Sequence, residues 1–378
     1  MQKIKKNILH LTHTDIRCDS RILKEIKALD QANYNVFGIG AELDENAKSE
    51  NTKSIKVTTV KLACRSLKFL PKPYRHLLTL LEFLCKLLPL SCKFKPDLIH
   101  CHDTIALVLG IFLKPLTGSK VVYDAHELES DRNGLSKKLG KVIFGFEKIV
   151  WKCIDGFITV SPSILKWYLK NLGQKKSEII LNSPEIKKRK PNRNKDLRKK
   201  FGIPQTKKIF LYNGIIGPGR SIKTLLQVFQ DPKIKSHIVF LGYGDWVSYI
   251  KEAQRNNSKI HYHKPVSHSE VVSLTTAADF GLCLIEKVSL SDFFCLPNKL
   301  FEYIFAGLPV LASKFPDIEK LVKEYDLGTV CEINIKNILA QVQKLENKNS
   351  RKKIKSLKKL SWLQQKRKLL NFYERVIR

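Results

Sequence analysis

The chain alternates between short apolar runs and amphipathic segments over most of its length. In the first half, β-branched and apolar residues concentrate in runs at 6–13, 34–40, 97–102, 120–126 and 156–161. The stretch at 20–34 spaces its apolar residues three or four positions apart, as an amphipathic helix does. Strand-like runs separated by helices predict βαβ units and a parallel sheet.

The same alternation restarts after a charged stretch in the middle of the chain. Residues 186–200 carry many Lys and Arg side chains and no hydrophobic period, which indicates an exposed, structureless connection. Beyond it, we predict strands at 207–214, 236–244, 259–266, 278–285 and 308–313. Helices are predicted at 221–230, 247–256, 269–277 and 298–306, and a basic amphipathic helix at 360–378. The second half is therefore a second parallel α/β unit.

The length of 378 residues predicts more than one domain, because single cores stop growing at about 250 residues. We predict an N-terminal Rossmann-like domain at 1–185 and a C-terminal one at 205–360. A basic linker at 186–204 joins them, and a C-terminal helix at 361–378 ends the chain. Two doubly wound sheets facing each other leave a cleft, and ligands bind there at the carboxyl ends of the strands.

The chain is strongly basic. Lys and Arg outnumber Asp and Glu by 68 to 35, which gives a formal net charge of +33. This excess favours anionic partners: phosphorylated ligands, an anionic membrane surface or nucleic acid. We expect no nucleic acid, because the basic residues are spread along the chain without an RNA-binding aromatic signature or a zinc finger. A Lys-rich compositional habit is the alternative interpretation.

Nine cysteines are scattered along the chain, and no CxxC pair occurs among them. An odd number without paired spacing indicates neither a disulfide framework nor a zinc site. A reducing cytoplasm therefore fits best.

The most apolar long segment is HLLTLLEFLCKLLPL, at 76–90. Glu82, Lys86 and Pro89 interrupt it, and a spanning helix needs about 20 apolar residues. Basic residues flank it on both sides, which suits a helix lying flat in an anionic membrane interface. A buried helix of the first domain is the other interpretation, and the sequence leaves both open.

Two glycine-containing turns follow strands in the second half. In LYNGIIGPGRSIKTLL, a strand runs through Gly214 into a Gly-Pro-Gly turn that ends at Gly219, and a helix follows. Glycines let the backbone approach a ligand and a helix N-terminus attracts anions, so Arg220 would face a phosphate there. In FLGYGDW, Gly242 and Gly244 would pass close to a nucleotide. A tight turn alone is the alternative for both.

One polar face stands in an otherwise apolar helix near the end of the second half. In LPNKLFEYIFAGLPVLAS, Asn298, Lys299 and Glu302 fall three or four residues apart and share a face near the helix start. A carboxylate there can accept two hydrogen bonds from a cis-diol such as that of ribose. A solvent-facing Lys–Glu pair is the alternative.

Histidines follow two strands of the first half. In VVYDAHELESD, His126 stands between Asp124 and Glu127, where an imidazole can act as acid, base or hydrogen-bond donor near neutral pH. In LIHCHD, His102 and Asp103 end another strand. The His-x-His pair suggests metal binding, but no third ligand with suitable spacing follows, so we predict no metal site.

The loop after the first strand is charged. HTDIRCDSRI holds Asp15, Arg17, Asp19 and Arg21. Because loops at the carboxyl ends of parallel strands line the ligand site, we expect this loop to face the cleft. A surface loop closed by ion pairs is the alternative.

The order and spacing of these stretches resemble a known family. DSRILKEIKAL, DLIHCHD, VVYDAHEL, DGFITVSPSI and IILNSP are similar to the first half of the family 4 glycosyltransferases of GT-B fold. YNGIIGPGRSIKTLL, IVFLGYGD, AADFGLCLI and PNKLFEYIFAGLPVLAS are similar to the second half, and SWLQQKRKLLNFYERV to the last helix. The resemblance covers nearly the whole chain and implies a GT-B fold, whose last helix crosses back to the first domain.

The resemblance implies that a sugar moves from a nucleotide-sugar donor to an acceptor with retention, without a cofactor or an obligatory metal. The donor would lie against the second domain and the acceptor against the first. Three residues would be catalytic. Glu302 would accept hydrogen bonds from the ribose hydroxyls, Arg220 would bind the diphosphate, and His126 would contact the transferred sugar. The resemblance also places the loop with Asp15, Arg17, Asp19 and Arg21 beside the diphosphate and the acceptor. From the residues themselves, we add His102 and Asp103 to that loop and expect donor-binding roles for Gly214, Gly219, Lys223, Gly242, Gly244, Asn298 and Lys299.

The family context also suggests the substrates. We expect a UDP-sugar in preference to a GDP-sugar, carrying a hexose or an N-acetylhexosamine. The acceptor would be a glycan or a polyprenyl-diphosphate-linked glycan in bacterial surface polysaccharide biosynthesis. The basic surface would hold the enzyme as a peripheral protein on the cytoplasmic face of the membrane.

Two positions depart from the family pattern. Phe294 stands where the family often has a glutamate that contacts the sugar, and either Asn298 and Lys299 or a differently aligned Asp292 would replace its function. Ile215 stands where the family often has an arginine, which leaves the diphosphate to Arg220 with help from Lys223 or Lys299.

Three other functions stay open. A sugar-nucleotide epimerase is built on the same two-domain fold and converts its donor without an acceptor. A nucleic-acid-binding protein would use the positive charge instead. An inactive partner subunit would explain the missing glutamate.

Overall fold

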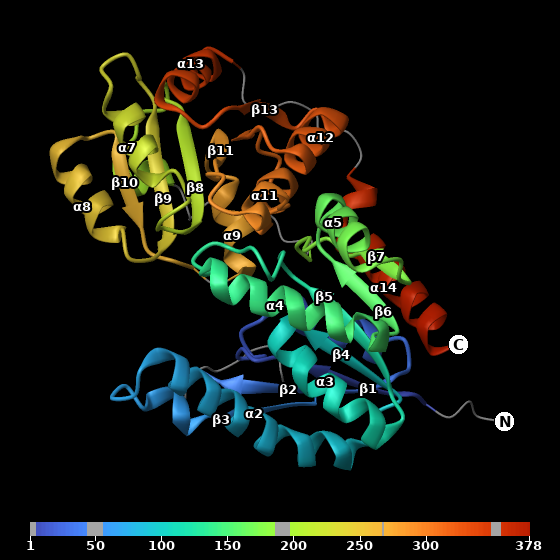
Figure 1. Cartoon of the computed structure of the whole chain (residues 1–378). Helices are drawn as coiled ribbons and strands as arrows, with labels where there is room; N and C mark the ends of the chain where they lie inside the picture. Colours follow the sequence, from blue (N-terminus) through green and yellow to red (C-terminus); the bar gives the residue numbers. More distant parts are fainter. Residues whose placement is uncertain (1–4, 44–55, 186–196, 267, 349–356) are drawn as a thin grey trace. The chain divides into compact units, whose positions relative to one another are not determined.

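The structure, a computed structural model, describes residues 5–43, 56–185, 197–266, 268–348 and 357–378. The chain divides into two compact units (Figure 1). Unit 1 consists of Met1–Ile180 together with Gln365–Arg378, and unit 2 consists of Leu181–Gln364. Of the predicted basic linker, residues 186–196 lie outside the described part of the chain.

Unit 1 is built on a seven-stranded, wholly parallel sheet in the order β3-β2-β1-β4-β5-β6-β7. The central strands β1, β4 and β5 are almost completely buried, as strands covered by helices on both faces are expected to be. The strands of unit 1 are β1 (Asn7–Leu11), β2 (Asn35–Glu42), β3 (Val57–Lys61), β4 (Leu98–His102), β5 (Lys120–Ala125), β6 (Gly156–Thr159) and β7 (Ser177–Ile179).

Helices cover both faces of this sheet. Because the strand order reverses at β1, right-handed crossovers put α1 and α3 on opposite faces. In Figure 1, α2, α3 and α4 lie in a row on one face. The helices are α1 (Ser20–Asp30), α2 (Lys72–Phe94), α3 (Asp103–Thr117), α4 (Lys137–Val150) and α5 (Pro162–Leu172), with short 3-10 turns at Ala63–Ser66 and Trp151–Cys153.

The last helix, α14 (Trp362–Ile377), belongs to unit 1 from Gln365 onward. Lys366 Nζ donates a hydrogen bond to Gln31 Oε1 at the end of α1, at 2.6 Å. Gly156 of β6 leaves room for the helix, since a Cβ there would lie 2.7 Å from the Phe372 ring. The predicted return of the last helix to the first half of the chain is confirmed.

Unit 2 is built on a six-stranded, wholly parallel sheet in the order β10-β9-β8-β11-β12-β13. The prediction of two Rossmann-like doubly wound sheets is therefore confirmed. The strands of unit 2 are β8 (Ile209–Ile215), β9 (His237–Tyr243), β10 (Ile260–His263), β11 (Phe280–Cys283), β12 (Val310–Ser313) and β13 (Gly328–Cys331).

A core of aromatic and branched side chains fills the space between this sheet and its helices. Gly281 of β11 lets one helix approach closely, because a Cβ there would lie 2.3 Å from the Tyr303 ring. The helices are α6 (Leu197–Phe201), α7 (Ile222–Gln230), α8 (Val247–Asn256), α9 (His268–Thr275), α10 (Leu290–Phe293), α11 (Asn298–Phe305), α12 (Pro316–Tyr325) and α13 (Ile335–Glu346), with a 3-10 turn at Lys358–Leu360.

The elements that sequence reasoning missed lie mainly at the sheet edges. The strands β3, β7 and β13 are edge strands, and most of their side chains are half-buried. Edge strands face solvent on one side and so lack the continuous apolar run of a central strand. The stretch at 186–200 was predicted to be structureless, but its last residues begin α6, in which Leu197 is buried.

Candidate active site

Polar side chains of unit 1 share one face of the sheet near the carboxyl ends of its central strands. Side chains alternate along a strand, so His100 and His102 of β4 point to the same face. The register then places His10 of β1 opposite His100, and Asp124 of β5 opposite His102. The helices α1 and α14 cover this face, because Glu25 and Tyr373 contact the same cluster.

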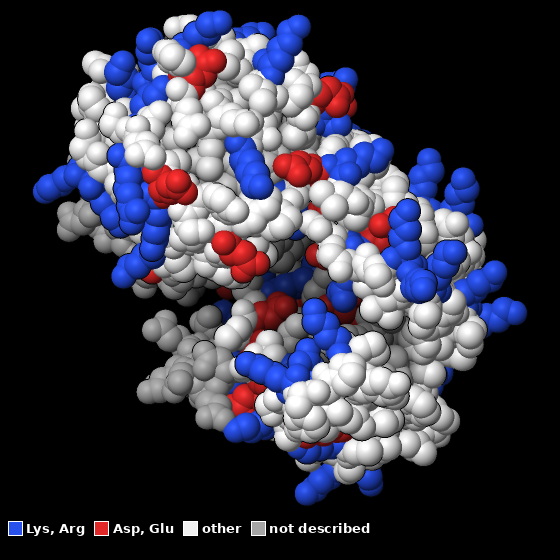
Figure 2. Space-filling view, turned by 60° about the vertical axis from the view of Figure 1, so that its left-hand side comes forward, with Lys and Arg blue, Asp and Glu red and all other residues white. Residues whose placement is uncertain are grey.

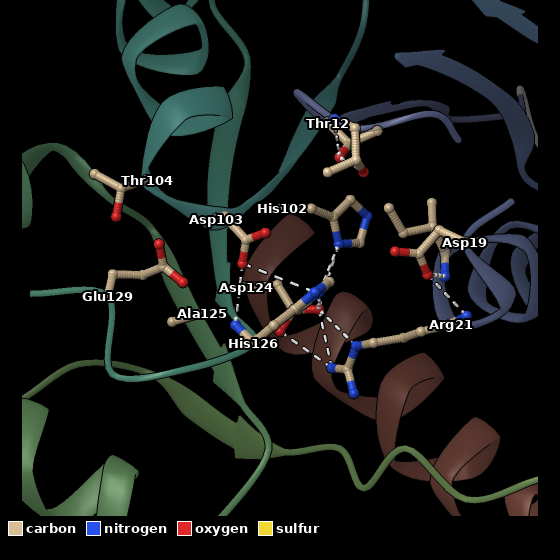
Figure 3. A network of polar contacts seen from close by, with 12 residues as sticks. Thr12, Asp19, Arg21, His102, Asp103, Thr104, Asp124, Ala125, His126 and Glu129 are labelled. Atoms are coloured by element: carbon tan, nitrogen blue, oxygen red, sulfur yellow. Dashed lines mark hydrogen bonds and ion pairs between the residues drawn. The ribbon is translucent and has the colours of Figure 1, made fainter. Parts of the chain in front are cut away.

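His126 lies just beyond β5 (Figure 3), and its side chain is 20% exposed, whereas the rest of this cluster is buried. Its Nε2 is 3.3 Å from Asp124 Oδ2 and 3.1 Å from His102 Nδ1. Its Nδ1 is 3.7 Å from Asp103 Oδ1, which also accepts the backbone N–H of His126 at 3.3 Å. Burial opposes the charged ring, but Asp103 and Asp124 outweigh it and raise the pKa of His126 to about 10. His126 is therefore a cation at neutral pH.

Asp103 adopts an unusual backbone conformation at the junction of β4 and α3. Its φ is +65°, in the left-handed region that non-glycine residues rarely occupy. Such strain tends to persist at functional sites, where the surrounding structure holds it in place. The conformation keeps the Asp103 carboxylate beside His126.

The buried carboxylate of Asp124 is held by an arginine. Arg21 Nη2 lies 2.9 Å from Asp124 Oδ2, and Arg21 Nη1 donates to the Ile180 carbonyl at 2.8 Å. Both side chains are almost fully buried. Burial alone would raise the pKa of Asp124, but Arg21 and His126 hold it well below the usual value. Arg21 is thus the buried partner of Asp124 and not an exposed cation of the loop.

The rest of the predicted charged loop is also satisfied within unit 1. Arg17 forms a bidentate pair with Asp15, with N–O distances of 2.9 and 2.7 Å. Asp15 also accepts the N–H of Leu43 at 3.3 Å. Asp19 caps α1 by accepting the backbone N–H groups of Arg21 and Ile22. These contacts match the alternative of a loop closed by its own ion pairs.

Two groups of side chains in unit 1 lie close enough to share an ion. In each group, one ligand atom per residue lies within 4.8 Å of the others; the groups are His10, Glu25, His100 and His102, and His102, Asp124 and His126. The sequence search for a third ligand missed His10 and Glu25, because only the strand register and the packing of α1 bring them to the His-x-His pair.

The ring geometry of the first group is that of a hydrogen-bonded stack. The rings of His10, His100 and His102 lie 4.3, 4.6 and 5.2 Å apart with interplanar angles of 19°, 23° and 25°. The planes of these three rings are nearly parallel, whereas a tetrahedral ion needs ligands that converge on it from different directions. The expectation that no metal is needed stays a prediction.

In unit 2, the acidic candidate lies between β8 and α11. Glu302 is only 6% exposed, and its Oε2 accepts a hydrogen bond from Asn213 Nδ2 at 2.5 Å. The backbone N–H of Asn213 donates to the hydroxyl of Tyr303 at 2.7 Å. The end of β8 and the start of α11 are therefore fixed to each other, with the carboxylate held at their junction.

Lys299 lies beside this carboxylate without a counter-ion. Its Nζ is 4.1 Å from the centroid of the Tyr212 ring, and a Cβ at Gly214 would lie 3.6 Å from it. The ammonium is shielded from solvent and has no hydrogen-bond partner among the described residues. Because a buried unpaired cation is unfavourable, this arrangement favours the binding of an anion next to Lys299.

Arg220, in the Gly-Pro-Gly turn, does have a counter-ion. Its Nη1 lies 2.9 Å from Asp292 Oδ1, and Asp292 Oδ2 accepts the Ser289 hydroxyl at 2.9 Å. Burial opposes the charge, but Asp292 outweighs it and raises the pKa of Arg220. Where the family pattern has a glutamate, Phe294 packs its ring 5.4 Å from that of Phe293.

The three charged candidates of unit 2 surround one strand end. Burial raises the pKa of the Cys283 thiol to about 11, and that thiol feels the charges of Lys299, Arg220 and Glu302 in that order. The structure thus brings these three side chains together at the end of β11. Asn298 is exposed at the first position of α11.

The glycine turns of unit 2 have internal structural reasons. A Cβ at Gly242 would lie 1.9 Å from the Gly214 carbonyl oxygen, and one at Gly244 would lie 2.3 Å from that of Ile216. The close approach of the ends of β8 and β9 therefore requires these two glycines. Gly219 has a φ of +75°, which favours glycine.

The first amide of the predicted anion-binding helix is already occupied. The backbone N–H of Ser221 donates to Glu286 Oε1 at 3.1 Å, and the N–H of Glu286 donates to the Gly219 carbonyl at 3.0 Å. Lys223, in the first turn of α7, places its ammonium over the aromatic rings of Trp246 and Tyr249, at 4.8 and 5.5 Å. Sequence reasoning missed Glu286 because its partner lies about 65 positions away.

Family models match both halves of the chain. The model for Glycosyltransferase Family 4 matches residues 21–183, and the model for Glycosyl transferases group 1 matches residues 193–360. A Candida albicans protein named chitobiosyldiphosphodolichol beta-mannosyltransferase is 23% identical over 233 residues. The match covers 56% of this chain and spans half the length, 50%, of that relative.

Solved structures match over almost the whole chain. The Anabaena protein HepE, solved in complex with UDP-glucose, aligns with a TM-score of 0.70 at 13% identity, covering 98% of this chain and 99% of its own. The apo form of the lipopolysaccharide outer core galactosyltransferase WaaB aligns with a TM-score of 0.65 at 12% identity, covering 98% and 99%. At these identities, the likeness shows a shared fold.

Proposed function

Since this chain belongs to the glycosyltransferases of family 4 type, with a GT-B fold, we propose that it transfers a sugar from a nucleotide-sugar donor to an acceptor hydroxyl, with retention of the anomeric configuration. The reaction needs no resident cofactor and no obligatory metal in this proposal. Unit 2 binds the donor, and unit 1 supplies residues to the transferred sugar and the acceptor.

The unpaired ammonium of Lys299 is the observation that carries this proposal. It lies with Arg220 and Glu302 around one strand end. A sugar nucleotide offers a diphosphate for the two cations and a ribose diol for the carboxylate. The diphosphate would give Lys299 the counter-ion that it lacks among the described residues, while Glu302 accepts hydrogen bonds from the ribose hydroxyls.

These groups also supply a mechanism. Negative charge develops on the leaving diphosphate as the bond to the sugar breaks. Cations held in place beforehand stabilise that charge without reorganising, typically by ~2.7–4 kcal/mol for each donor. The acceptor hydroxyl attacks the anomeric carbon from the same face from which the leaving group departs. The leaving phosphate takes the proton of that hydroxyl. The imidazolium of His126 contacts the transferred sugar.

We propose a UDP-sugar as the donor and a lipid-linked glycan as the acceptor. HepE was solved with UDP-glucose, which supports uridine. The names of the Candida albicans relative and of WaaB refer to a diphosphate-linked lipid and to lipopolysaccharide, which support acceptors of this kind. Synthesis of a bacterial surface polysaccharide is the process that we propose.

The surface of α2 and of the segment just before it supports work at a membrane. Phe69, in that segment, is 80% exposed, and Tyr74 and Leu77 of α2 are 65% and 55% exposed, although all three are large and apolar or aromatic. Only Phe83, Leu87 and Ser91 of α2 are buried, so the interpretation of 76–90 as a buried helix is wrong for most of its surface. Within the described residues, no helix is long and apolar enough to span a bilayer.

The charges on α2 favour an anionic lipid surface. Lys72, Arg75 and Lys93 are cationic, and the one carboxylate of the helix, Glu82, accepts hydrogen bonds from two backbone N–H groups and from Lys86. Each Lys or Arg near anionic lipid contributes about 1 kcal/mol. We therefore propose peripheral attachment to the cytoplasmic face of the membrane through this helix.

Vesicle sedimentation tests the attachment. The chain should sediment with anionic vesicles at low salt and be partly released at high salt, since salt screens surface charge. The double variant Phe69→Ser, Leu77→Gln should reduce the fraction of protein that stays bound to the vesicles at high salt. Tyr249→Ser, which removes an exposed aromatic of unit 2, is the matched control and should have no effect. Equal binding of all three proteins would exclude α2 as the contact.

A donor panel tests the transferase activity. UDP-, GDP-, ADP- and TDP-sugars are compared by thermal shift, where a ligand at 100 times its Kd stabilises the fold by ~2.7 kcal/mol. The UDP-sugars should stabilise the protein most, and Glu302→Gln should weaken that effect. Product analysis with and without a glycan acceptor then separates transfer from epimerisation, because an epimerase converts the donor alone.

Nucleic-acid binding has less support from the charge distribution. On the face shown in Figure 2, Lys and Arg side chains are scattered over the visible surface, with Asp and Glu among them. A nucleic-acid site gathers positive charge on one face or along one groove. Salt-dependent binding to RNA or DNA that outcompetes the sugar nucleotides would contradict the proposal.

A further inference from the structure

Three histidines of unit 1 form a continuous chain from the surface into the core. His126 Nε2 is hydrogen-bonded to His102 Nδ1 at 3.1 Å, and His102 Nε2 to His10 Nδ1 at 2.9 Å. The side chain of His126 is 20% exposed, whereas His102 and His10 are completely buried. The chain crosses three adjacent strands and ends beneath α1.

The proton positions along this chain depend on one another. A neutral imidazole has one donor and one acceptor nitrogen, and a charged imidazole has two donors. Because His126 is a cation, its Nε2–H donates and His102 Nδ1 must accept. The proton of His102 then lies on Nε2 and donates to His10 Nδ1, which leaves the proton of His10 on its Nε2.

The inner end of the chain lies beside a buried carboxylate. His10 Nε2 has no hydrogen-bond partner among the described residues, and a ring nitrogen of His10 lies within 4.8 Å of a Glu25 oxygen. Glu25 is completely buried and lies 3.2 Å from Arg21 and 3.9 Å from His100. The proposed order of tautomers places an N–H at this inner end, on a ring that lies close to the Glu25 side chain.

We propose that His102 and His10 are positioning residues whose tautomers are ordered so that an acceptor lone pair always faces His126. His126 thereby remains a cation that donates from Nε2 to His102, while its Nδ1 lies 3.7 Å from the Asp103 carboxylate. Contact of this cation with the transferred sugar rests on the proposed function, but the order of the tautomers does not.

Several charged or titratable groups act on His126 besides its chain partner His102, and all of them enter its charge balance. They come from β5, α1, α3 and the segment after β1, and they are Asp124, Arg21, Glu25, Asp103 and His13. Asp103 and Asp124 favour the cation, and Arg21 opposes it. The chain of His102 and His10 adds what a point charge cannot supply, namely a hydrogen-bond acceptor that faces His126 from a fixed direction. We call this chain of three histidines the histidine relay.

The tautomers can be read without any substrate. In the full chain labelled with 15N-histidine, ring nitrogen shifts at neutral pH should show His126 doubly protonated and both His102 and His10 protonated on Nε2. In His126→Leu the donor is gone, so His102 should carry its proton on Nδ1, toward Asp124 at 3.5 Å, and His10 should follow. The opposite order in the parent protein, or unchanged tautomers in His126→Leu, would overturn the proposal.

A matched pair of variants tests the inner end. His10→Phe keeps a ring in the stack but leaves His102 Nε2–H unpaired, which should lower the pKa of His126, measured by the same spectra, by ~1–2 pH units. His10→Asn places an amide oxygen near the former Nδ1 and should restore most of that loss. If both variants change the pKa of His126 equally, or if neither changes it, His10 has only a packing role and the proposal is contradicted.

The transfer rate provides a second reading. As pH rises, the His126 cation is lost, so kcat should fall on the alkaline side, and His10→Phe should move that fall toward neutral pH while KM stays unchanged. Should His10→Phe fail to fold, the tautomers of the parent protein and of His126→Leu decide the question alone. Binding of one equivalent of a divalent ion to the stacked histidines would also contradict the proposed order of tautomers. Absence of transfer with every donor would contradict the proposed function but would not affect the tautomer result.

Discussion

The two polar clusters of this protein differ in how completely their charged side chains are paired. In unit 1, Arg21 pairs with Asp124 and Glu25, and the loop before α1 closes on itself through Asp15 and Arg17. In unit 2, the ammonium of Lys299 lies over the ring of Tyr212 but has no hydrogen-bond partner and no counter-ion among the described residues. Paired charges hold a structure together, whereas a cation without a partner lowers stability and is retained when a ligand completes it. The first cluster therefore mainly stabilises the folded structure, whereas the second favours the binding of an anion.

Removing an arginine from the first cluster should give the largest effect. Arg21→Leu leaves the buried carboxylate of Asp124 without its main partner, and breaking a buried pair in this way typically costs 3–5 kcal/mol, roughly, in the free energy of unfolding. Urea unfolding followed by circular dichroism measures the change. A loss below about 1 kcal/mol would show that water or His126 compensates the charge and would weaken the contrast between the units.

Removing the lysine from the second cluster should leave the fold intact and abolish most activity. Lys299→Met keeps a long apolar side chain over Tyr212 but loses the ammonium, so kcat/KM should fall by about 10³-fold, at the upper end of the range for one preorganised donor. The free energy of unfolding should stay the same or rise, because the buried unpaired charge is gone. Loss of stability together with activity would mean that an internal partner holds Lys299.

Arg220 occupies an intermediate position, because it is paired with Asp292 and still lies close to Lys299 and the proposed anion site. Arg220→Ala should lower turnover by about 10²-fold, less than Lys299→Met, since Asp292 already neutralises part of its charge. Asp292→Asn is the matched control, and it should keep Arg220 near its place and lower turnover less. If the two variants lose equal activity, Asp292 itself contacts the sugar in place of the missing glutamate.

The sequence predicted the fold well, for a physical reason. The central strands β1, β4 and β8 are buried on both faces and read as apolar runs, and these runs were found with boundaries close to those observed. The edge strands β3 and β13 carry half-buried side chains and give no such signal. Periodicity reports burial, and an element that is only partly buried is only partly visible in the sequence.

The candidate sites could be predicted by residue type but not by partner. The sequence identified Lys299, Glu302 and Arg220 as candidates, but their pairing depends on the register of β8 and β11 and on the short helix that carries Asp292. In the same way, His10 gave no signal of its own, because only its position opposite His100 makes it part of a cluster. Contacts between distant segments follow from the fold and cannot be read from local patterns.

The smallest expected effect concerns a loop residue to which the resemblance gives a role in binding. Asp19 caps α1 through the N–H groups of Arg21 and Ile22, at 2.9 and 3.1 Å. Asp19→Ala should cost about 1 kcal/mol of unfolding free energy, and Asp19→Asn, which can still cap the helix, only a fraction of that.

Enzyme kinetics on the same two variants then separate the cap from the charge. If Asp19 serves only to begin α1, kcat/KM should change little in Asp19→Asn, because the helix and the Arg21–Asp124 pair behind it stay in place. If Asp19→Asn is fully stable but loses ten-fold or more in kcat/KM, the carboxylate acts on the diphosphate or the acceptor. Unit 1 would then also hold a charge for a ligand, and the contrast between a structural cluster and a binding cluster would no longer follow the division of the chain.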